Sequence, residues 1–279
     1  MSGSPGCGES LVVADSRPLL QSHGLREFSD FMSLAGGIPV ARKRGRTVVR
    51  LELGERAFYL KRNRFHWGEF WKTLSCLRLP PRGARQEWRS ILAVRAAGIP
   101  TVPPVAMGER VCWGIEAESF TLTEELYDTE PLENVIRREF TGKLSPLMRT
   151  EKRDLTERVA ALAKRLHGSG MYHQDLYLGH FFLGRDNALY LIDVQRVVRC
   201  NRVPRRYLVK DLGQLAFSAW ETGGISRTDR MRFFHAYLGV MKLGPGEKEL
   251  ARSILKKQEK IARHTVKLLE RRRRRGEIS

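Results

Sequence analysis

Alternating apolar and polar residues predict a small antiparallel sheet in the first half of the chain. Residues 47–53 and 57–62 alternate in this way and flank a Gly-Glu turn, which is typical of a β-hairpin. Three further short apolar segments, at residues 102–107, 111–115 and 120–124, are expected to add strands to the same sheet.

Apolar residues at helical spacing predict helices, most of them in the second half of the chain. The segment 84–97 repeats Trp88 and Ile91 on one face and stops at Gly98 and Pro100, which end helices. Further helices are expected at residues 68–79, 155–167, 212–220 and 247–275. The first half should therefore be a sheet with few helices, and the second half mainly helical.

One hairpin stands out within the helical half, between His173 and Asp193. The pattern predicts a loop that carries Asp175, a strand at residues 181–183, a polar turn, and a strand at residues 189–192 that leads directly into Asp193. A carboxylate at the end of an apolar strand is costly without a partner, which argues against a buried hairpin with incidental charges. Two carboxylates are thus expected at the two ends of one hairpin.

Two carboxylates in this arrangement suit phosphoryl transfer, with Asp175 receiving or orienting the acceptor hydroxyl and Asp193 holding Mg²⁺. The order of these residues resembles the catalytic core of protein-kinase-like enzymes. His180 stands where kinases usually have a second metal-binding Asn. His180 could therefore join the metal site. Imidazole is a poor Mg²⁺ ligand, however, so the alternative is that His180 only orders the loop. We expect structural roles for His173 and Asp211, with Asp211 accepting hydrogen bonds from the backbone around His173.

The first hairpin carries a candidate nucleotide site. Lys61 follows a β-branched and aromatic strand, where a kinase-like fold places its phosphate-binding lysine. Glu87 is its natural partner, or else a favourable carboxylate at a helix N-terminus. No Gly-x-Gly-x-x-Gly motif precedes Lys61, so backbone amides near Gly45 would cradle the phosphates. Glu124 and Leu126 are expected to contact adenine in a hinge, or else to belong to a plain edge strand.

A strong positive charge points to an anionic partner. The net charge is +19, and the cations are concentrated in residues 41–100 and 216–279. The partner could be nucleic acid, an acidic lipid surface or a phosphorylated substrate, or the charge could simply form a soluble basic face. Cations between Asp193 and Asp211 suit phosphate or carboxylate groups of an acceptor. Four of them are assigned to substrate binding: Arg199, Arg202, Arg205 and Arg206.

The last predicted helix combines an apolar stripe with many cations and ends in the arginine run 271–275. A basic amphipathic helix of this kind commonly lies on an acidic membrane surface. The alternative is a helix packed on the core, with a solvated charged tail.

Other features limit the class of protein. No apolar run reaches the length of a transmembrane helix, and the start of the chain lacks a signal-peptide pattern, so we expect a cytosolic protein. The four cysteines lie far apart without a Cys-x-x-Cys pair, so they indicate neither a disulfide framework nor a zinc site. The chain begins with Gly, Ser and Pro, and residues 1–35 are expected to form a flexible N-terminal segment.

Several short motifs together identify a more specific likeness. They are Tyr59-Leu-Lys, Leu77-Arg-Leu-Pro, Ala97-Gly-Ile-Pro, Gly170-Met-Tyr-His-Gln-Asp-Leu-Tyr-Leu-Gly-His-Phe-Phe-Leu and Val203-Pro-Arg-Arg-Tyr. With these motifs, the chain resembles the lipopolysaccharide core heptose(I) kinase family from about residue 40 to residue 238. Gln174 and Leu176 differ from the Arg and Cys that are more usual in that family.

The resemblance implies an α+β, protein-kinase-like bilobal fold. Its small antiparallel-sheet N-lobe would cover residues 36–126, its mainly helical C-lobe residues 127–245, and a basic C-terminal helix residues 246–279. The implied enzyme uses ATP and Mg²⁺ to phosphorylate a heptose hydroxyl of the lipopolysaccharide inner core in the Gram-negative envelope. It would be cytoplasmic and peripheral on the inner membrane, with the lipid-linked core acceptor and the anionic membrane surface as partners, and no nucleic acid.

Other functions remain open at this point. The departures at Gln174 and Leu176 leave a neighbouring acidic sugar as an alternative acceptor. The same fold could also phosphorylate another small molecule or a protein. A different class would be a weakly catalytic scaffold that uses its basic surface to hold a membrane or RNA.

Overall fold

A computed structural model describes residues 9–43, 45–64, 83–112 and 115–275. The chain divides into two compact units, of which unit 1 contains residues 1–95 and 101–127, and unit 2 contains residues 96–100 and 128–279. The change of unit after residue 127 falls one residue beyond the expected N-lobe boundary. The helix expected at residues 68–79, with the Leu77-Arg-Leu-Pro motif, lies outside the described residues.

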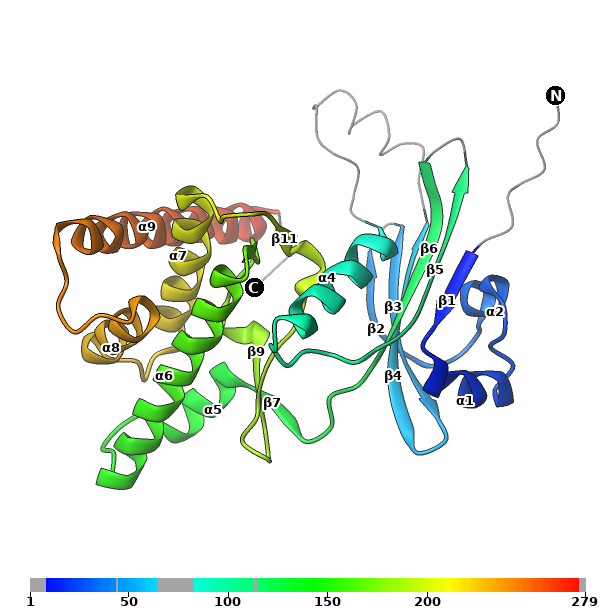
Figure 1. The fold of residues 1–279 in the computed structure, drawn as a ribbon, viewed down its shortest axis with the longest axis horizontal. Helices are drawn as coiled ribbons and strands as arrows, with labels where there is room; N and C mark the ends of the chain where they lie inside the picture. The colour runs from blue at the N-terminus through cyan, green and yellow to red at the C-terminus, as the bar shows by residue number, and fades with distance from the viewer. Residues whose placement is uncertain (1–8, 44, 65–82, 113–114, 276–279) are drawn as a thin grey trace. The chain divides into compact units, whose positions relative to one another are not determined.

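Unit 1 is built on a six-stranded antiparallel sheet with the order β1-β5-β6-β4-β3-β2 (Figure 1). Its strands are β1 (Glu9–Val12), β2 (Ile38–Lys43), β3 (Arg46–Leu53), β4 (Arg56–Arg64), β5 (Pro104–Cys112) and β6 (Ile115–Glu124). The predicted hairpin is confirmed as β3 and β4. The prediction of three strands after residue 101 is wrong, because β5 and β6 are two long strands that continue through the polar residues between the apolar segments.

Helices cover both faces of this sheet (Figure 1). On one face lies α4 (Ala84–Ala96), which buries Trp88 and Ile91 and ends one residue before the predicted limit. On the other face lie α1 (Arg17–Ser22) and α2 (Phe28–Ser33), with a short 3₁₀ turn, Ala14–Ser16, before them. Phe31 stacks on Phe120 of β6 with ring centroids 4.3 Å apart.

The expectation of a flexible segment at residues 1–35 is therefore wrong for its described part. Residues 9–12 form the edge strand β1, which pairs with β5. Leu20, Leu25 and Phe28 are buried in the same core as the sheet. Gly, Ser and Pro are densest in the first ten residues. The apolar residues that follow bury enough surface to fix two helices.

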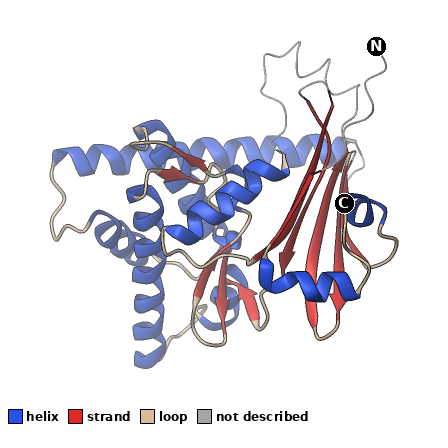
Figure 2. Ribbon diagram, turned by 45° about the vertical axis from the view of Figure 1, so that its right-hand side comes forward, coloured by secondary structure: helices blue, strands red, loops and turns tan. Residues whose placement is uncertain are grey.

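Unit 2 is mainly helical (Figure 2). Its helices are α5 (Leu132–Glu139), α6 (Pro146–Gly168), α7 (Arg205–Thr222), α8 (Arg227–Leu238) and α9 (Pro245–Arg274). Its strands form two small sheets, β10-β9-β7 and β11-β8. These strands are β7 (Thr129–Pro131), β8 (Met171–Tyr172), β9 (Phe181–Gly184), β10 (Leu189–Leu191) and β11 (Val198–Arg199), with 3₁₀ turns at Leu178–His180 and Val194–Arg196.

Two helices begin earlier than the apolar pattern predicts. The helix expected at residues 155–167 is α6, which begins at Pro146 after Ser145 accepts a hydrogen bond from the N–H of Met148. The helix expected at residues 212–220 is α7, which begins after Pro204. A proline marks both starts, at the first helical position of α6 and at the N-cap of α7. Leu147, in the first turn of α6, is exposed, so the apolar stripe that faces the core begins only farther along.

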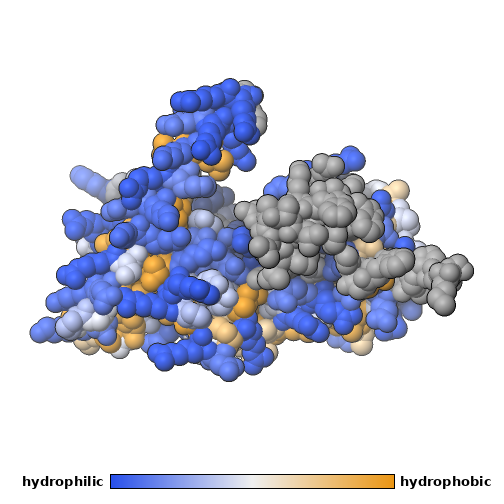
Figure 3. Space-filling model, turned by 90° about the horizontal axis from the view of Figure 1, so that it is seen from above, coloured by the Kyte–Doolittle hydropathy of each residue, from blue (hydrophilic) through white to orange (hydrophobic). Residues whose placement is uncertain are grey.

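The C-terminal helix α9 belongs to unit 2 and packs against α7, which it crosses (Figure 1). Ile254 is buried in this contact, whereas Val266, Leu268 and Leu269 near the arginine run are exposed. Part of the predicted apolar stripe thus serves the core, and part is left on the surface. On the face drawn in Figure 3 the described surface is mainly hydrophilic, with apolar side chains in scattered patches.

Candidate active site

The hairpin β9–β10 fixes the positions of the two candidate carboxylates. Phe181 pairs with Leu191 across the hairpin, and both side chains are fully buried. The N–H of Ile192 donates to the carbonyl of His180 at 2.9 Å, which brings the residue after β10 back beside the residue before β9. Asp193 consequently lies next to His180, with 3.8 Å between Oδ2 and Nε2.

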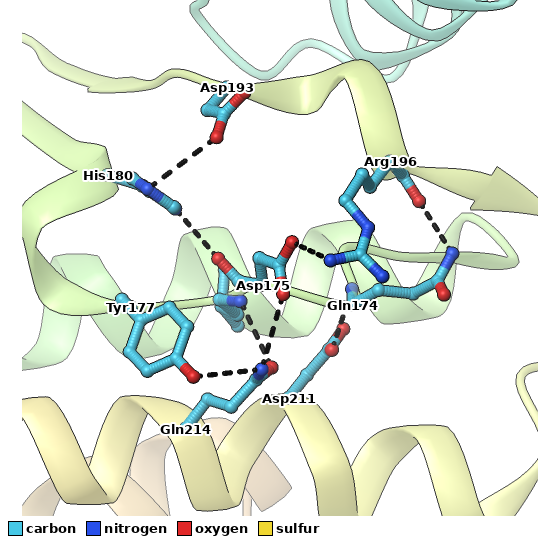
Figure 4. A network of polar contacts seen from close by, with 9 residues as sticks. Gln174, Asp175, Tyr177, His180, Asp193, Arg196, Asp211 and Gln214 are labelled. Carbon is cyan, nitrogen blue, oxygen red and sulfur yellow. Dashed lines mark hydrogen bonds and ion pairs between the residues drawn. The ribbon is translucent and has the colours of Figure 1, made fainter. Parts of the chain in front are cut away.

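Asp193 sits in the left-handed region of the backbone, with φ 55° and ψ 40°. This conformation is uncommon outside glycine and best tolerated by Asn and Asp. It turns the chain sharply into the 3₁₀ turn Val194–Arg196. That turn returns Arg196 towards the loop that carries Asp175 (Figure 4).

Asp175 is held by two side chains that the sequence analysis did not assign to it. Arg196 Nη1 lies 2.5 Å from Asp175 Oδ2, and Gln214 Nε2 lies 3.5 Å from Oδ1 (Figure 4). The main chain of the same loop is fixed as well, since the carbonyl of Asp175 lies 2.7 Å from Nδ1 of His180. Both carboxylate oxygens therefore have a cationic or polar neighbour, and the carboxylate is partly exposed.

Asp211 supports this loop from α7, in the contact expected of it. Its Oδ2 accepts from the N–H of His173 at 2.6 Å, and its Oδ1 accepts from the N–H of Gln174 at 2.9 Å. His167 Nε2 lies 3.3 Å from the same Oδ2, and the Asp211 side chain is fully buried. A buried carboxylate needs such partners, and here they fix two successive residues just before Asp175.

Two further residues of α7 complete the support and were missed by sequence reasoning. Gln214 Oε1 accepts from the N–H of Leu176 at 3.3 Å, and Ser218 Oγ accepts from the N–H of Leu178 at 2.8 Å. Asp211, Gln214 and Ser218 are spaced by three and four residues, which places them on one helix face. This spacing of polar residues on an otherwise apolar helix face was the signal that could have found them.

His173 is buried behind the loop. Its Nε2 lies 3.2 Å from the carbonyl of Ile192, and among the described residues its Nδ1 has no hydrogen-bond partner. Burial, followed by repulsion from His180, lowers the pKa of His173. The neutral ring therefore connects the loop before Asp175 to the strand before Asp193, as expected for a structural residue.

Unit 1 contains the expected lysine–glutamate pair. Lys61 Nζ in β4 lies 2.7 Å from Glu87 Oε2 in α4, and both side chains are largely buried. Thr121 of β6 also approaches Glu87, at 3.4 Å. The Glu87 carboxylate, in the first turn of α4, thus contacts two strands of the sheet.

Of the two predicted adenine contacts, Glu124 already has partners within unit 1. The N–H of Glu124 donates to the carbonyl of Pro103, and its carboxylate forms a bidentate pair with Arg56. That N–H is therefore engaged within unit 1, and Leu126, the other predicted contact, is the second residue after the end of β6. Gly45 has φ 75° between β2 and β3, and its carbonyl accepts from the N–H of Arg64.

The four arginines assigned to substrate lie in different settings of unit 2. Arg199 ends β11 and Arg202 lies in the following bend, and both are exposed. Arg205 pairs with Glu249 of α9 at 2.7 Å. Arg206 lies over the ring of Tyr207, 4.7 Å from its centroid. The structure thus leaves Arg199 and Arg202 as exposed cations, whereas Arg205 is part of an α7–α9 contact.

The donor atoms near Asp193 suit Mg²⁺ better than a transition metal. No cluster of three or more His, Cys, Asp or Glu side chains that could hold a metal occurs in the described part of the chain. Mg²⁺ needs no such cluster, because it commonly takes one or two carboxylates and completes its shell with phosphates and water. The half-exposed carboxylate of Asp193 fits this use, and His180 beside it offers only imidazole nitrogen.

A unit built on an antiparallel sheet, followed by a mainly helical unit, is the architecture of the protein-kinase-like class. The family model described as the lipopolysaccharide kinase (Kdo/WaaP) family matches residues 37–237. The chain belongs to this family, so the predicted fold class and family likeness are confirmed.

Individual relatives agree with this assignment. The chain is 37% identical over 201 residues to the lipopolysaccharide core heptose(I) kinase WaaP of Pseudomonas aeruginosa, covering 69% of this chain and 74% of that protein. It is 32% identical over 233 residues to the protein of the same name in Escherichia coli strain K12, covering 79% and 85%. A solved structure titled "WaaP in complex with acyl carrier protein" aligns with TM-score 0.71 and 28% identity, covering 93% of this chain and 99% of that one.

Proposed function

We propose that this chain transfers the γ-phosphate of ATP to a heptose hydroxyl of the lipopolysaccharide inner core. The relatives named as heptose(I) kinases support the acceptor, because they match across most of both chains. The observation that carries the chemistry is the support of Asp175 by Arg196 and Gln214, on a loop that Asp211 fixes from below.

In this proposal Asp175 orients the acceptor hydroxyl and receives its proton. The new bond forms between the hydroxyl oxygen and the γ-phosphorus, while the bond from that phosphorus to the bridging oxygen of ADP breaks. Gln214 and Arg196 hold the carboxylate in one orientation, so that little reorganisation is needed when the proton moves. Arg196 also supplies positive charge next to a reacting centre that carries the negative charge of the phosphoryl group.

Asp193 would hold Mg²⁺, which supplies charge neutralisation for the nucleotide phosphates when bound. The left-handed turn at Asp193 places its carboxylate at the end of β10, in line with this role. His180 would act mainly by ordering the loop, through its contacts with Asp193 and with the carbonyl of Asp175. Lys61 would hold nucleotide phosphates, positioned by Glu87, while backbone groups near Gly45 and Leu126 would contact the rest of ATP.

A lipid-linked acceptor would account for the exposed cations. Arg199, Arg202 and Arg206 would attract the phosphates and carboxylates of an inner-core glycan. Among the described helices, none combines the length and the apolar composition that crossing a membrane requires. Contact with the inner membrane would therefore be peripheral, through the arginine-rich end of α9 on the anionic cytoplasmic leaflet.

The solved WaaP structure is a complex with acyl carrier protein, which suggests that protein as one further partner of this chain. A mainly apolar cavity of about 350 Å³ in unit 2 is consistent with a partner that carries an acyl chain. It is lined in part by Leu132, Ile136, Leu155, Leu215, Phe234 and Ile254. Co-purification of the chain with acyl carrier protein, analysed by intact mass spectrometry, would test this association.

The activity is tested by incubating the full chain with ATP, Mg²⁺ and an inner-core acceptor, and locating the added phosphate by mass spectrometry. Asp175→Asn keeps the size of the side chain but removes the proton acceptor, so we expect at least about a 10²-fold loss of kcat. Asp154→Asn, on an exposed position of α6, makes the same chemical change and serves as the matched control. Phosphate found on another sugar, or an Asp175→Asn variant that keeps its rate, would contradict the proposal.

A further inference from the structure

A cationic pocket lies on the face of the unit 1 sheet that α2 covers. It has a volume of about 640 Å³ and is lined by the end of α2 and by β2, β3 and β4. Its lining includes Arg42, Arg62 and Arg64, and no Asp or Glu among the described residues. Apolar lining on this face comes from Met32, Pro39 and Val49. The pocket thus combines several cations with an apolar wall.

The strand register separates this pocket from the lysine–glutamate pair. Thr47 of β3 is opposite Arg42 on one side and Arg62 on the other, so these three side chains form one row across the sheet. Successive side chains of a strand point to opposite faces, so Arg62 and Lys61 face opposite sides. Lys61 contacts Glu87 of α4, whereas Arg62 Nη1 donates to the carbonyl of Met32 at the end of α2.

The electrostatics of the pocket are unbalanced. Arg62 is held by two carbonyls, those of Met32 at 3.1 Å and Leu34 at 2.9 Å, but its buried Nε has no hydrogen-bond partner among the described residues. Burial, followed by repulsion from Arg64, lowers the pKa of Arg62. The carboxylate of Glu118 lies 3.4 Å from Arg64 and offsets part of its positive charge, but the same carboxylate also pairs with Arg110. An anion in the pocket would satisfy a buried donor and relieve the repulsion between neighbouring guanidinium groups.

We propose that this pocket binds the phosphate group of an amphipathic ligand. Guanidinium groups bind phosphate with paired hydrogen bonds, and the apolar wall suits the carbon chain or ring attached to that phosphate. An anionic phospholipid headgroup or a phosphorylated glycan on a lipid anchor has this chemistry. The site includes none of Asp175, Asp193 and Lys61, although Gly45, proposed above to contact ATP, also lines it. It would give unit 1 its own contact with an anionic lipid surface.

The test uses the full chain and two probes. Inorganic phosphate binding is measured by calorimetry, and vesicle binding by flotation with phosphatidylglycerol mixed into phosphatidylcholine, compared with phosphatidylcholine alone. Arg42→Gln and Arg64→Gln each remove one cation of the pocket, and both residues are exposed, which favours retained folding. Arg89→Gln removes an exposed cation of α4 outside the pocket and matches the change in net charge. Thermal melting verifies that all three variants are folded.

We expect each pocket variant to bind phosphatidylglycerol vesicles about fivefold more weakly, with Arg89→Gln close to the original chain. Parallel weakening of phosphate binding supports a site for the phosphate group itself. Weakening with vesicles alone supports the lipid headgroup as the source, and weakening with inorganic phosphate alone supports a phosphorylated glycan. Equal effects of all three substitutions, or no binding of either probe by the original chain, would overturn the proposal.

Discussion

Arg196 contacts the carboxylate of Asp175 from the far side of the β9–β10 hairpin, 21 residues later in the chain. The contact depends on the left-handed turn at Asp193, which redirects the chain into the 3₁₀ turn that carries Arg196. Gln174 Nε2 reinforces it by donating to the carbonyl of Arg196 at 2.8 Å. The two candidate carboxylates are thus coupled through one short segment.

Replacing Arg196 should lower kcat and leave KM for ATP unchanged. Arg196→Ala removes the group that holds Asp175, and we expect kcat to fall at least about tenfold, which corresponds to about 1.4 kcal/mol of transition-state stabilisation. Arg196→Lys should recover part of the rate because it keeps the charge. Steady-state kinetics with varied ATP would measure both, and an increase in KM for ATP at unchanged kcat would show that Arg196 acts on nucleotide binding instead.

The buried carboxylate of Asp211 should matter for stability as well as for rate. Asp211→Asn replaces one accepting oxygen by an amide that opposes the N–H of His173 or Gln174. We expect a loss of about 1–3 kcal/mol in the free energy of unfolding. Urea denaturation would measure it, with Asp154→Asn on the exposed face of α6 as the control. An unchanged midpoint would mean that water replaces these hydrogen bonds without cost.

Loss of Lys61 should have two separable effects. Lys61→Ala leaves Glu87 partly buried without its cation, so stability should fall together with ATP use. Adding Glu87→Gln should restore much of the stability and none of the ATP use. The comparison of thermal midpoints with KM for ATP across the single and double variants distinguishes a nucleotide role from a purely structural ion pair.

The lowered pKa of His173 predicts acid sensitivity. In the unfolded state His173 has the ordinary histidine pKa of 6.5, whereas in the folded state the ring resists protonation until a lower pH. Between these two values the unfolded state holds more protons, so the free energy of unfolding falls as pH falls, by up to about 1.4 kcal/mol per pH unit. Urea titrations from pH 8 to pH 5 would show this slope.

His173→Gln is the matched variant, because its amide is able to donate to the carbonyl of Ile192. It should flatten the pH dependence of stability below pH 6.5. An identical slope in both proteins would assign the acid sensitivity to another group.

Much of the fold was predictable because local patterns and tertiary structure agree. The β3–β4 and β9–β10 hairpins follow from alternation around turn residues, and the contact of Asp211 with the loop before Asp175 follows from the family pattern. The early residues were misjudged because their first few are polar and small, whereas Phe28 and Phe31 find their partner in Phe120, about ninety residues away.

The parts of the site that were missed depend on tertiary contacts, even where the sequence carries a signal such as the spacing of Asp211, Gln214 and Ser218. The pairing of Arg196 with Asp175 requires the hairpin and the turn at Asp193 to be in place first. Gln214 and Ser218 become meaningful only when their helix face is known to meet the backbone of Leu176 and Leu178. The pairing of Arg205 with Glu249 was likewise not predictable, because Glu249 lies in a helix far along the chain.

The left-handed backbone of Asp193 restricts how this protein could change over evolutionary time. Asn and Gly are the residues that would keep the turn at least cost, whereas most other side chains would strain it. A lineage that lost catalysis but kept the scaffold would therefore be expected to carry Asn or Gly at this position. Because Asn also preserves an oxygen donor, an Asn-containing descendant would still present a weakened cation site, and a Gly-containing one would be a binding protein only.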